Sequence, residues 1–149
     1  MKYTGRMIEK LNSLLIMNNE VEKLYTEALN LVKEDNFSAF FREQAYERNE
    51  FGKELKIEIE KLEVAPKELV ALSRAFYLKR MNFKNLIKLN AEAELFNEVY
   101  TLKVNSINNY NALLMERNLP LSLCKVLIKQ RDRIQVKLNA LKREEQFVA

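Results

Sequence analysis

Four glutamates in one short segment have the residue type and the spacing of a metal-binding helix. They follow one another at intervals of four, three and four residues and are Glu43, Glu47, Glu50 and Glu54. This spacing places them along one line of a helix. Such a line can supply part of a two-metal site when inward carboxylates and histidines from other helices complete it. It is also what the solvated flank of a helix looks like, so the direction of these side chains decides the interpretation.

The elements that would position these glutamates are helices. The chain has only 2 Gly and 2 Pro in 149 residues, which leaves few places for turns. Apolar residues recur at intervals of three and four along most of its length, which is typical of helices with one buried face. The predicted helices cover about residues 5–33, 37–63, 67–88, 91–117 and 120–145.

The order and length of these helices predict an all-α fold in a single domain, residues 1–149. Two long helical hairpins, joined by a connection of about two dozen residues, are typical of a four-helix bundle with a crossover. The crossover is expected to hold the additional short helix at 67–88. Asn90 is the expected N-cap of the helix that follows it.

Three segments carry a family resemblance: MIEKLNSLLIMNNEVEKLYTEAL, FFREQAYERNEFGKELKIEIEKL and AELFNEVYTLKVNSINNYNALLMERNLP. In this order they resemble a family of uncharacterised bacterial proteins described only as a ferritin-like domain of unknown function. The resemblance spans roughly residues 7–143, and its most specific parts are ERNEFGKEL and the ending Tyr110 to Asn118-Leu119-Pro120. It implies a ferritin-like four-helix bundle, and it implies no established activity.

The chain departs from that family where relatives carry potential ligands. Tyr77 and Arg80 lie about where relatives have a glycine-rich stretch with histidine and tryptophan. Lys103 stands near a glutamate of relatives, and Leu138 near a histidine. Each departure removes a potential ligand.

The sequence does not support a complete metal site. It contains no histidine, which excludes the usual ligand set of a two-metal bundle. At about 100° per residue, only Glu47 reaches the edge of its helix's apolar sector, and Glu22 lies at the margin of the first helix. We therefore predict a solvated flank, no metal and no cofactor. A degenerate, carboxylate-only metal site is the alternative.

Polar residues do fall on the inward faces. Arg48 and Lys103 lie within apolar sectors, and Asn18, Gln44, Ser106 and Gln130 lie near the same level of the predicted bundle. Because a buried cation needs a partner, we predict an ion pair between Glu22 and Arg48, with Gln44 and Tyr25 as hydrogen-bonding neighbours. The alternative is that Arg48 and Lys103 extend their charged ends to water.

Charge is unevenly distributed along the chain. Residues 1–65 carry 10 basic and 13 acidic residues (net −3), and residues 66–149 carry 15 and 8 (net +7). This asymmetry suits an acidic protein partner or a second copy of the chain. A basic surface that could bind nucleic acid through phosphates is a rival interpretation, and its candidate residues are Lys79, Arg80, Lys84, Lys88, Arg131 and Arg133.

No enzymatic activity is expected. Without histidine, no serine, threonine or cysteine has its usual activating base. The lone Cys124 cannot form an internal disulfide, no apolar run is long enough to span a membrane, and the start of the chain lacks a secretory signal. We therefore predict a cytoplasmic, non-catalytic protein with a structural or protein-interaction role. A homodimer is one form that this interaction could take, and no membrane partner is expected. Nucleic-acid binding and carboxylate-only metal binding are the alternatives.

Overall fold

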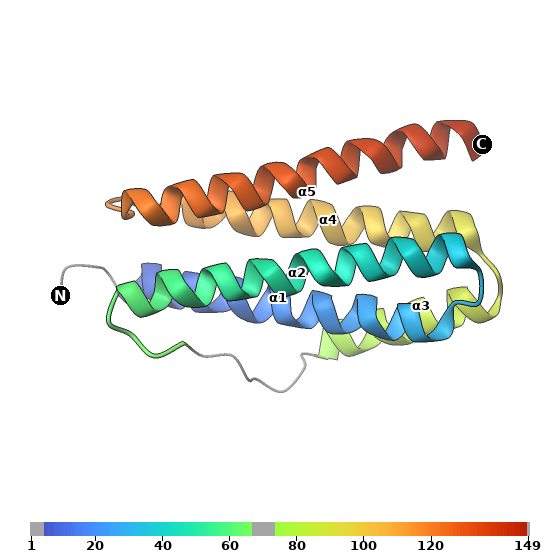
Figure 1. The fold of residues 1–149 in the computed structure, drawn as a ribbon, viewed down its shortest axis with the longest axis horizontal. Helices are drawn as coiled ribbons and strands as arrows, with labels where there is room; N and C mark the ends of the chain where they lie inside the picture. Colours follow the sequence, from blue (N-terminus) through green and yellow to red (C-terminus); the bar gives the residue numbers. More distant parts are fainter. Residues whose placement is uncertain (1–4, 67–73, 149) are drawn as a thin grey trace.

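The computed structural model describes residues 5–66 and 74–148, and every regular element within these residues is a helix (Figure 1). This confirms the prediction of an all-α protein. The helices are α1 (Gly5–Leu31), α2 (Asp35–Lys61), α3 (Arg74–Lys88), α4 (Glu92–Leu114) and α5 (Leu121–Val148).

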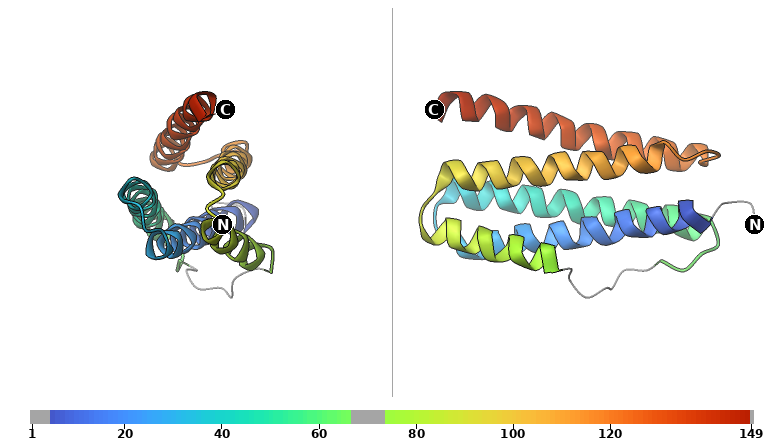
Figure 2. Two further views of the ribbon diagram at one scale, coloured as in Figure 1. Left: turned by 90° about the vertical axis from the view of Figure 1, so that its right-hand side faces the viewer. Right: turned by 180° about the vertical axis from the view of Figure 1, so that it is seen from behind.

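The four long helices lie side by side, and the shorter α3 packs outside them. α1 and α2 form one antiparallel hairpin, and α4 and α5 form a second (Figure 1). The hairpins meet where α1 contacts α4 and where α2 contacts α5. α3 packs on α1 and α4. The end-on view in Figure 2 shows it on the side of the molecule opposite α5.

The helix boundaries follow the prediction with local corrections. The helix expected at 67–88 is present from Arg74 to Lys88, and its expected first part lies outside the described residues. α2 begins at Asp35, preceded by Glu34 in an extended conformation that makes no side-chain cap. α4 ends at Leu114, before its predicted end.

Asn90 does not cap α4 as predicted; it ends α3 instead. Its φ of 55° is the left-handed conformation that asparagine tolerates better than most residues. The backbone N–H of Asn90 donates to the carbonyl of Ile87, and that of Ala91 donates to the carbonyl of Leu86. These two bonds form a Schellman motif, which satisfies the last carbonyls of α3. Ala91 occupies the N-cap position of α4.

The core consists of two apolar clusters at opposite ends of the long helices. One contains Leu11 and Leu15 of α1, Leu55 of α2 and Leu127 of α5, together with their neighbours. The other is built from the second half of α1, the starts of α2 and α4, and the apolar residues of α3. Between the clusters lies a level of buried polar side chains, which we call the polar layer: Asn18, Gln44, Arg48, Lys103, Ser106, Tyr110 and Gln130.

Candidate functional site

Arg48 of α2 is at the centre of the polar layer. Its side chain is 1% exposed, which makes it the largest fully buried side chain of the described residues. One terminal nitrogen donates to Asn18 Oδ1 at 3.0 Å, and the other donates to Ser106 Oγ at 3.1 Å. Both acceptors are neutral, so the guanidinium is bound by dipoles of α1 and α4 rather than by a carboxylate.

The hydrogen bonds continue from Arg48 through all four long helices. Asn18 of α1 donates to the hydroxyl of Tyr110 on α4 at 3.1 Å. Tyr110 donates to Gln130 Oε1 on α5 at 2.5 Å, and Gln130 Nε2 donates to the carbonyl of Phe51 on α2 at 3.2 Å. The path therefore returns to α2, one turn from Arg48. Burial raises the pKa of Tyr110, so its hydroxyl keeps the proton that it donates.

Lys103 of α4 is the second cation of the layer, and it is fully buried. Its Nζ donates to Gln44 Oε1 at 2.5 Å and lies 5.7 Å from the centre of the Tyr25 ring. Burial, reinforced by the charge of Arg48, lowers the pKa of Lys103 to about 7. Burial likewise raises the pKa of Tyr25 to about 12, and its hydroxyl has no hydrogen-bond partner among the described residues.

The structure gives Arg48 different partners from the one predicted. Glu22 accepts a hydrogen bond from Asn49 Nδ2 at 3.0 Å and makes no ion pair with Arg48. Adjacent residues of a helix point about 100° apart. Asn49 therefore faces the edge between α1 and α2, where Glu22 lies, while Arg48 faces the interior. The predicted burial of Gln44, Tyr25 and Lys103 is observed, although Tyr25 makes none of the hydrogen bonds expected of it.

The glutamate line of α2 lies at the edge of the structure. Glu47 is largely covered, with 11% of its side chain exposed, and it accepts from Lys137 of α5 at 2.8 Å, while Glu54 is half-buried. Glu43 is 68% exposed and contacts the same lysine, and Glu50 pairs with Lys53 on its own helix.

These residues do not fit a pair of metal ions. Within the described residues, no three acidic or cysteine side chains converge in the way that metal ligands do. The middle of the interior contains the basic side chains of Arg48 and Lys103, and the permanent positive charge of Arg48 repels divalent cations.

The predicted basic residues do not form one surface. On α3, Arg80 pairs with Glu27 of α1, while Lys84 and Lys88 border a cavity of about 460 Å³ at the end of the long helices. On α5, Arg131 binds Asn111 and Asp132. Since α3 and α5 lie on opposite sides of the molecule (Figure 2), the two basic groups are separated. Lys79 of α3 and Arg133 of α5 are divided in the same way.

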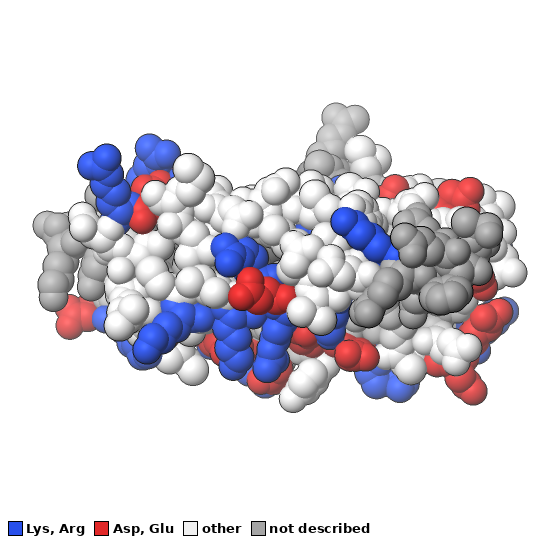
Figure 3. All heavy atoms as spheres, turned by 90° about the horizontal axis from the view of Figure 1, so that it is seen from above, with Lys and Arg blue, Asp and Glu red and all other residues white. Residues whose placement is uncertain are grey.

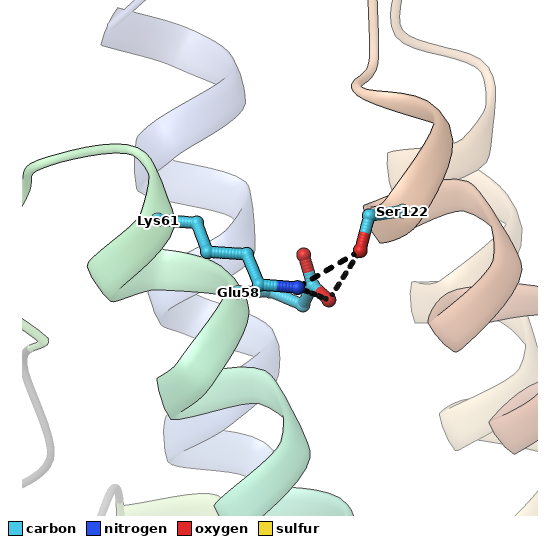
Figure 4. Close-up of polar contacts among 3 residues, drawn as sticks. All are labelled: Glu58, Lys61 and Ser122. Carbon is cyan, nitrogen blue, oxygen red and sulfur yellow. Dashed lines mark hydrogen bonds and ion pairs between the residues drawn. The ribbon is translucent and has the colours of Figure 1, made fainter.

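One buried carboxylate was not predicted from the sequence. Glu58 of α2 is 5% exposed and accepts from Ser122 Oγ of α5 at 2.8 Å and from Lys61 Nζ at 3.2 Å (Figure 4). Glu58 precedes Ile59, which belongs to the apolar stripe, so its position beside that stripe was the available signal. A hydrogen-bonding role for Tyr110 was also not predicted from the sequence, although a buried tyrosine hydroxyl usually requires a partner.

Two further properties limit the chemistry that the site could perform. Lys103 and Tyr110, which are titratable side chains of the polar layer, are hydrogen-bonded to amide side chains in the interior. Over the described residues, no helix combines the length and the apolar composition that a membrane crossing requires.

Comparison with known proteins gives a family and no closer relative. A search of curated proteins and a search of solved structures each find no match to this chain. Residues 6–116 match a family described as a domain of unknown function, DUF2383. This range contains α1 to α4 almost completely, and with them Arg48, Lys103 and Tyr110. The chain therefore belongs to the DUF2383 family.

Proposed function

We propose that this protein is a non-catalytic, ferritin-like four-helix bundle of the bacterial cytoplasm that has a structural or protein-interaction role. The arrangement of the helices supports the ferritin-like comparison, since two hairpins lie side by side and the connection between them holds α3. One observation carries the functional part of the proposal. Arg48 and Lys103, bound by neutral side chains, fill the middle of the interior.

A metal-dependent reaction needs ligands that this interior does not offer. Iron and manganese sites in helical bundles rely on several inward carboxylates and on imidazoles. Here Glu47 is directed to Lys137, Glu22 to Asn49, and Glu58 to Ser122. Glu22 lies at the edge between α1 and α2, and Glu47 and Glu58 lie about three helical turns apart at the edge between α2 and α5, so the three carboxylates do not converge on one ion.

A metal-independent reaction would need a reactive acid or base that a substrate can reach, and among the described residues the side chain whose pKa lies near neutrality is buried. Lys103, whose pKa is near neutrality, is enclosed by Gln44 and Tyr25 and is not exposed to solvent. A substrate would have to separate the long helices in order to reach its amine. These features favour a protein whose surface, rather than its interior, makes the functional contacts.

Metal analysis of the purified protein tests this proposal. The protein is produced in cells supplied with iron and manganese, and metal per chain is measured by mass spectrometry of the digested sample. We expect well below one metal ion per chain, together with an unchanged unfolding temperature when Fe²⁺ or Mn²⁺ is added.

The variant Glu47→Gln is the matched control, because it removes the most deeply placed carboxylate of the glutamate line. We expect the same metal content as in the unmodified protein. About one or more ions per chain, lost in Glu47→Gln, would replace this proposal with the carboxylate-only metal site.

A further inference from the structure

Two rows of opposite charge border the seam between α2 and α5. The acidic row is the glutamate line of α2: Glu43, Glu47, Glu50 and Glu54. The basic row repeats every four residues along α5: Lys125, Lys129, Arg133 and Lys137. Each row therefore lies along one line of its helix. Seen from the side of α5, basic and acidic groups gather beside each other along one edge of the molecule (Figure 3).

Three contacts set the register of the two rows. Glu58 binds Ser122, the Phe51 carbonyl binds Gln130, and Glu47 binds Lys137. Since the helices are antiparallel, residues whose numbers sum to about 180 lie at the same level. Glu50 is therefore level with Lys129, and Glu54 is nearly level with Lys125.

Half of these eight charges make no ion pair with another described residue. Lys137 is the member of the basic row that reaches across, to Glu43 and Glu47. A groove of about 560 Å³ lies along the seam and is bordered by Glu47, Lys129 and Arg133, among others. Among the described residues, Lys125, Lys129 and Arg133 are exposed and make no ion pair. Glu50 contacts only Lys53, in an exposed pair of the kind that contributes little.

Exposed apolar side chains lie near the two rows, and those of α2 are at about the same levels along the helix axes as those of α5. Tyr46 and Ile57 of α2 are 67% and 54% exposed, and Leu121 and Val136 of α5 are 71% and 64% exposed. Tyr46 lies within about one turn of the level of Val136, and Ile57 within about one turn of the level of Leu121. Apolar residues on both helices can therefore add contact area to the pairing of charges.

We propose that this face binds a second copy of the chain, in a two-fold symmetric dimer whose axis runs parallel to the long helices. Such an axis lays α2 of each copy on α5 of the other and preserves the level of every residue. The partner's Glu50 then meets Lys129 and Arg133, and the partner's Tyr46 meets Val136. The proposal deepens the interaction role stated above and rests on it.

The distribution of charge selects this arrangement over others. A two-fold axis perpendicular to the helices, in the plane of the face, would lay α2 on α2 and α5 on α5, and would oppose like charges. A nucleic acid on the basic row would lie beside the acidic row, which repels phosphate. A copy related by the parallel axis meets both rows with their complements, because the same patch supplies both.

Charge-swap variants test the pairing. Variant A carries Lys125→Glu and Lys129→Glu, variant B carries Glu54→Lys and Glu50→Lys at the same two levels, and variant AB carries all four changes. Mass is measured by sedimentation velocity across protein concentrations at low and high salt. We expect a dimer for the unmodified chain, weakened by salt. The dissociation constant should rise at least about tenfold in A and in B.

Restored dimerisation in variants with compensating charge changes would show that the acidic row of one copy contacts the basic row of the other. Variant AB, and a mixture of A with B, should form dimers again, because in both cases every acidic row faces a basic row. A matched control with Lys23→Glu and Lys84→Glu reverses two exposed cations on α1 and α3. It should dimerise as the unmodified chain does, and circular dichroism should give the same helix content for every variant.

Three outcomes would overturn the proposal: a monomer at all concentrations, a dimer that A and B leave unchanged, or loss in A and B without restoration in AB. A ladder of larger species would replace the closed dimer with an open chain of copies. None of these outcomes changes the metal content, so failure of the dimer is distinguishable from failure of the proposed function.

Discussion

Arg48 carries a permanent charge into the interior, where no carboxylate of the described residues forms an ion pair with it. Removing a charged group from water costs several kcal/mol, and the hydrogen bonds to Asn18 and Ser106 offset only part of that cost. A guanidinium tolerates this position better than an ammonium, since it is more weakly hydrated and spreads its charge over a planar group. Its two bonds also require the side chains of α1 and α4 to be in defined places.

Lys103 differs from Arg48 because it can lose its proton. Its folded-state pKa is about 7, against 10.5 for an unperturbed lysine, because burial and the nearby charge of Arg48 disfavour the ammonium. The other charged groups that act on it are Glu47 and Glu43 of α2 and Lys137 of α5. Between pH 7 and 10.5 the unfolded chain therefore binds a proton that the folded chain does not bind.

The free energy of unfolding should rise with pH in this window. Stability increases with pH wherever the unfolded state binds more protons, by up to about 1.4 kcal/mol per pH unit for one group. The contribution of Lys103 is fully present above pH 10.5 and is lost as the pH falls to 7. The measurement is urea unfolding at intervals between pH 6.5 and 9.0, where Tyr25 and Tyr110 remain largely protonated in the unfolded chain as well, since an unperturbed tyrosine has a pKa of 10.0.

The variant Lys103→Met removes the titrating group and should flatten this rise, whereas Lys23→Met, at an exposed position of α1, should leave it unchanged. Equal slopes in Lys103→Met and in the unmodified protein would show that the amine is charged in the folded state at neutral pH.

At the scale of the helices, the periodic pattern was enough to predict the elements and the inward direction of Arg48 and Lys103. Burial follows from angular position, which sequence reports well. Two predictions were wrong, and in each case the result depends on a single side-chain direction or a single backbone dihedral angle. Glu22 and Arg48 share a level but face different neighbours, and Asn90 takes a left-handed φ rather than the N-cap. The choice of Asn18 and Ser106 as partners depends on how two hairpins meet, which no pattern along a single helix contains.

The contact between Glu58 and Ser122 should help to hold α5 against α2. We expect Ser122→Ala to cost about 1 kcal/mol, because Glu58 then keeps Lys61 as its only bonding partner in this cluster. The coupling free energy between the two residues is more informative than the effect of one substitution. It is obtained from a double-mutant cycle that combines Ser122→Ala with Glu58→Ala, with stability measured by urea unfolding. It should be about 0.5–1.5 kcal/mol, since the cycle cancels the change in helix propensity at the start of α5.

Lys61→Ala is the matched control for this cycle. Its side chain is 55% exposed, and exposed ion pairs contribute little, so it should cost less than about 0.5 kcal/mol. A coupling near zero between Glu58 and Ser122, with a large effect of Lys61→Ala, would assign the contact between the helices to Lys61, whose Nζ also donates to Ser122 Oγ at 3.1 Å.

At the scale of the whole molecule, the polar layer separates two apolar clusters that are alike in chemistry. Leucine, isoleucine and phenylalanine pack interchangeably enough that long helices can slide or rotate with little cost. The hydrogen bonds of the layer involve all four long helices, so a shifted arrangement would leave Arg48 and Gln130 without acceptors. The layer thus favours one register of the helices. The stability that is lost by burying these polar groups is accepted in exchange for that specificity.

Replacing the centre of the layer by apolar residues should separate stability from specificity. In the variant Asn18→Leu, Gln44→Leu, Arg48→Met and Lys103→Met, both buried cations leave together with an amide partner of each. Exchange of buried charges for apolar side chains of similar volume is often neutral or stabilising by about 1–4 kcal/mol, so the free energy of unfolding should stay equal or rise. The dispersion of amide signals in a heteronuclear NMR spectrum should decrease, because several registers become close in energy. A variant that is less stable by more than about 2 kcal/mol, yet keeps a well-dispersed spectrum, would mean that the layer contributes stability and that the apolar clusters alone determine the register.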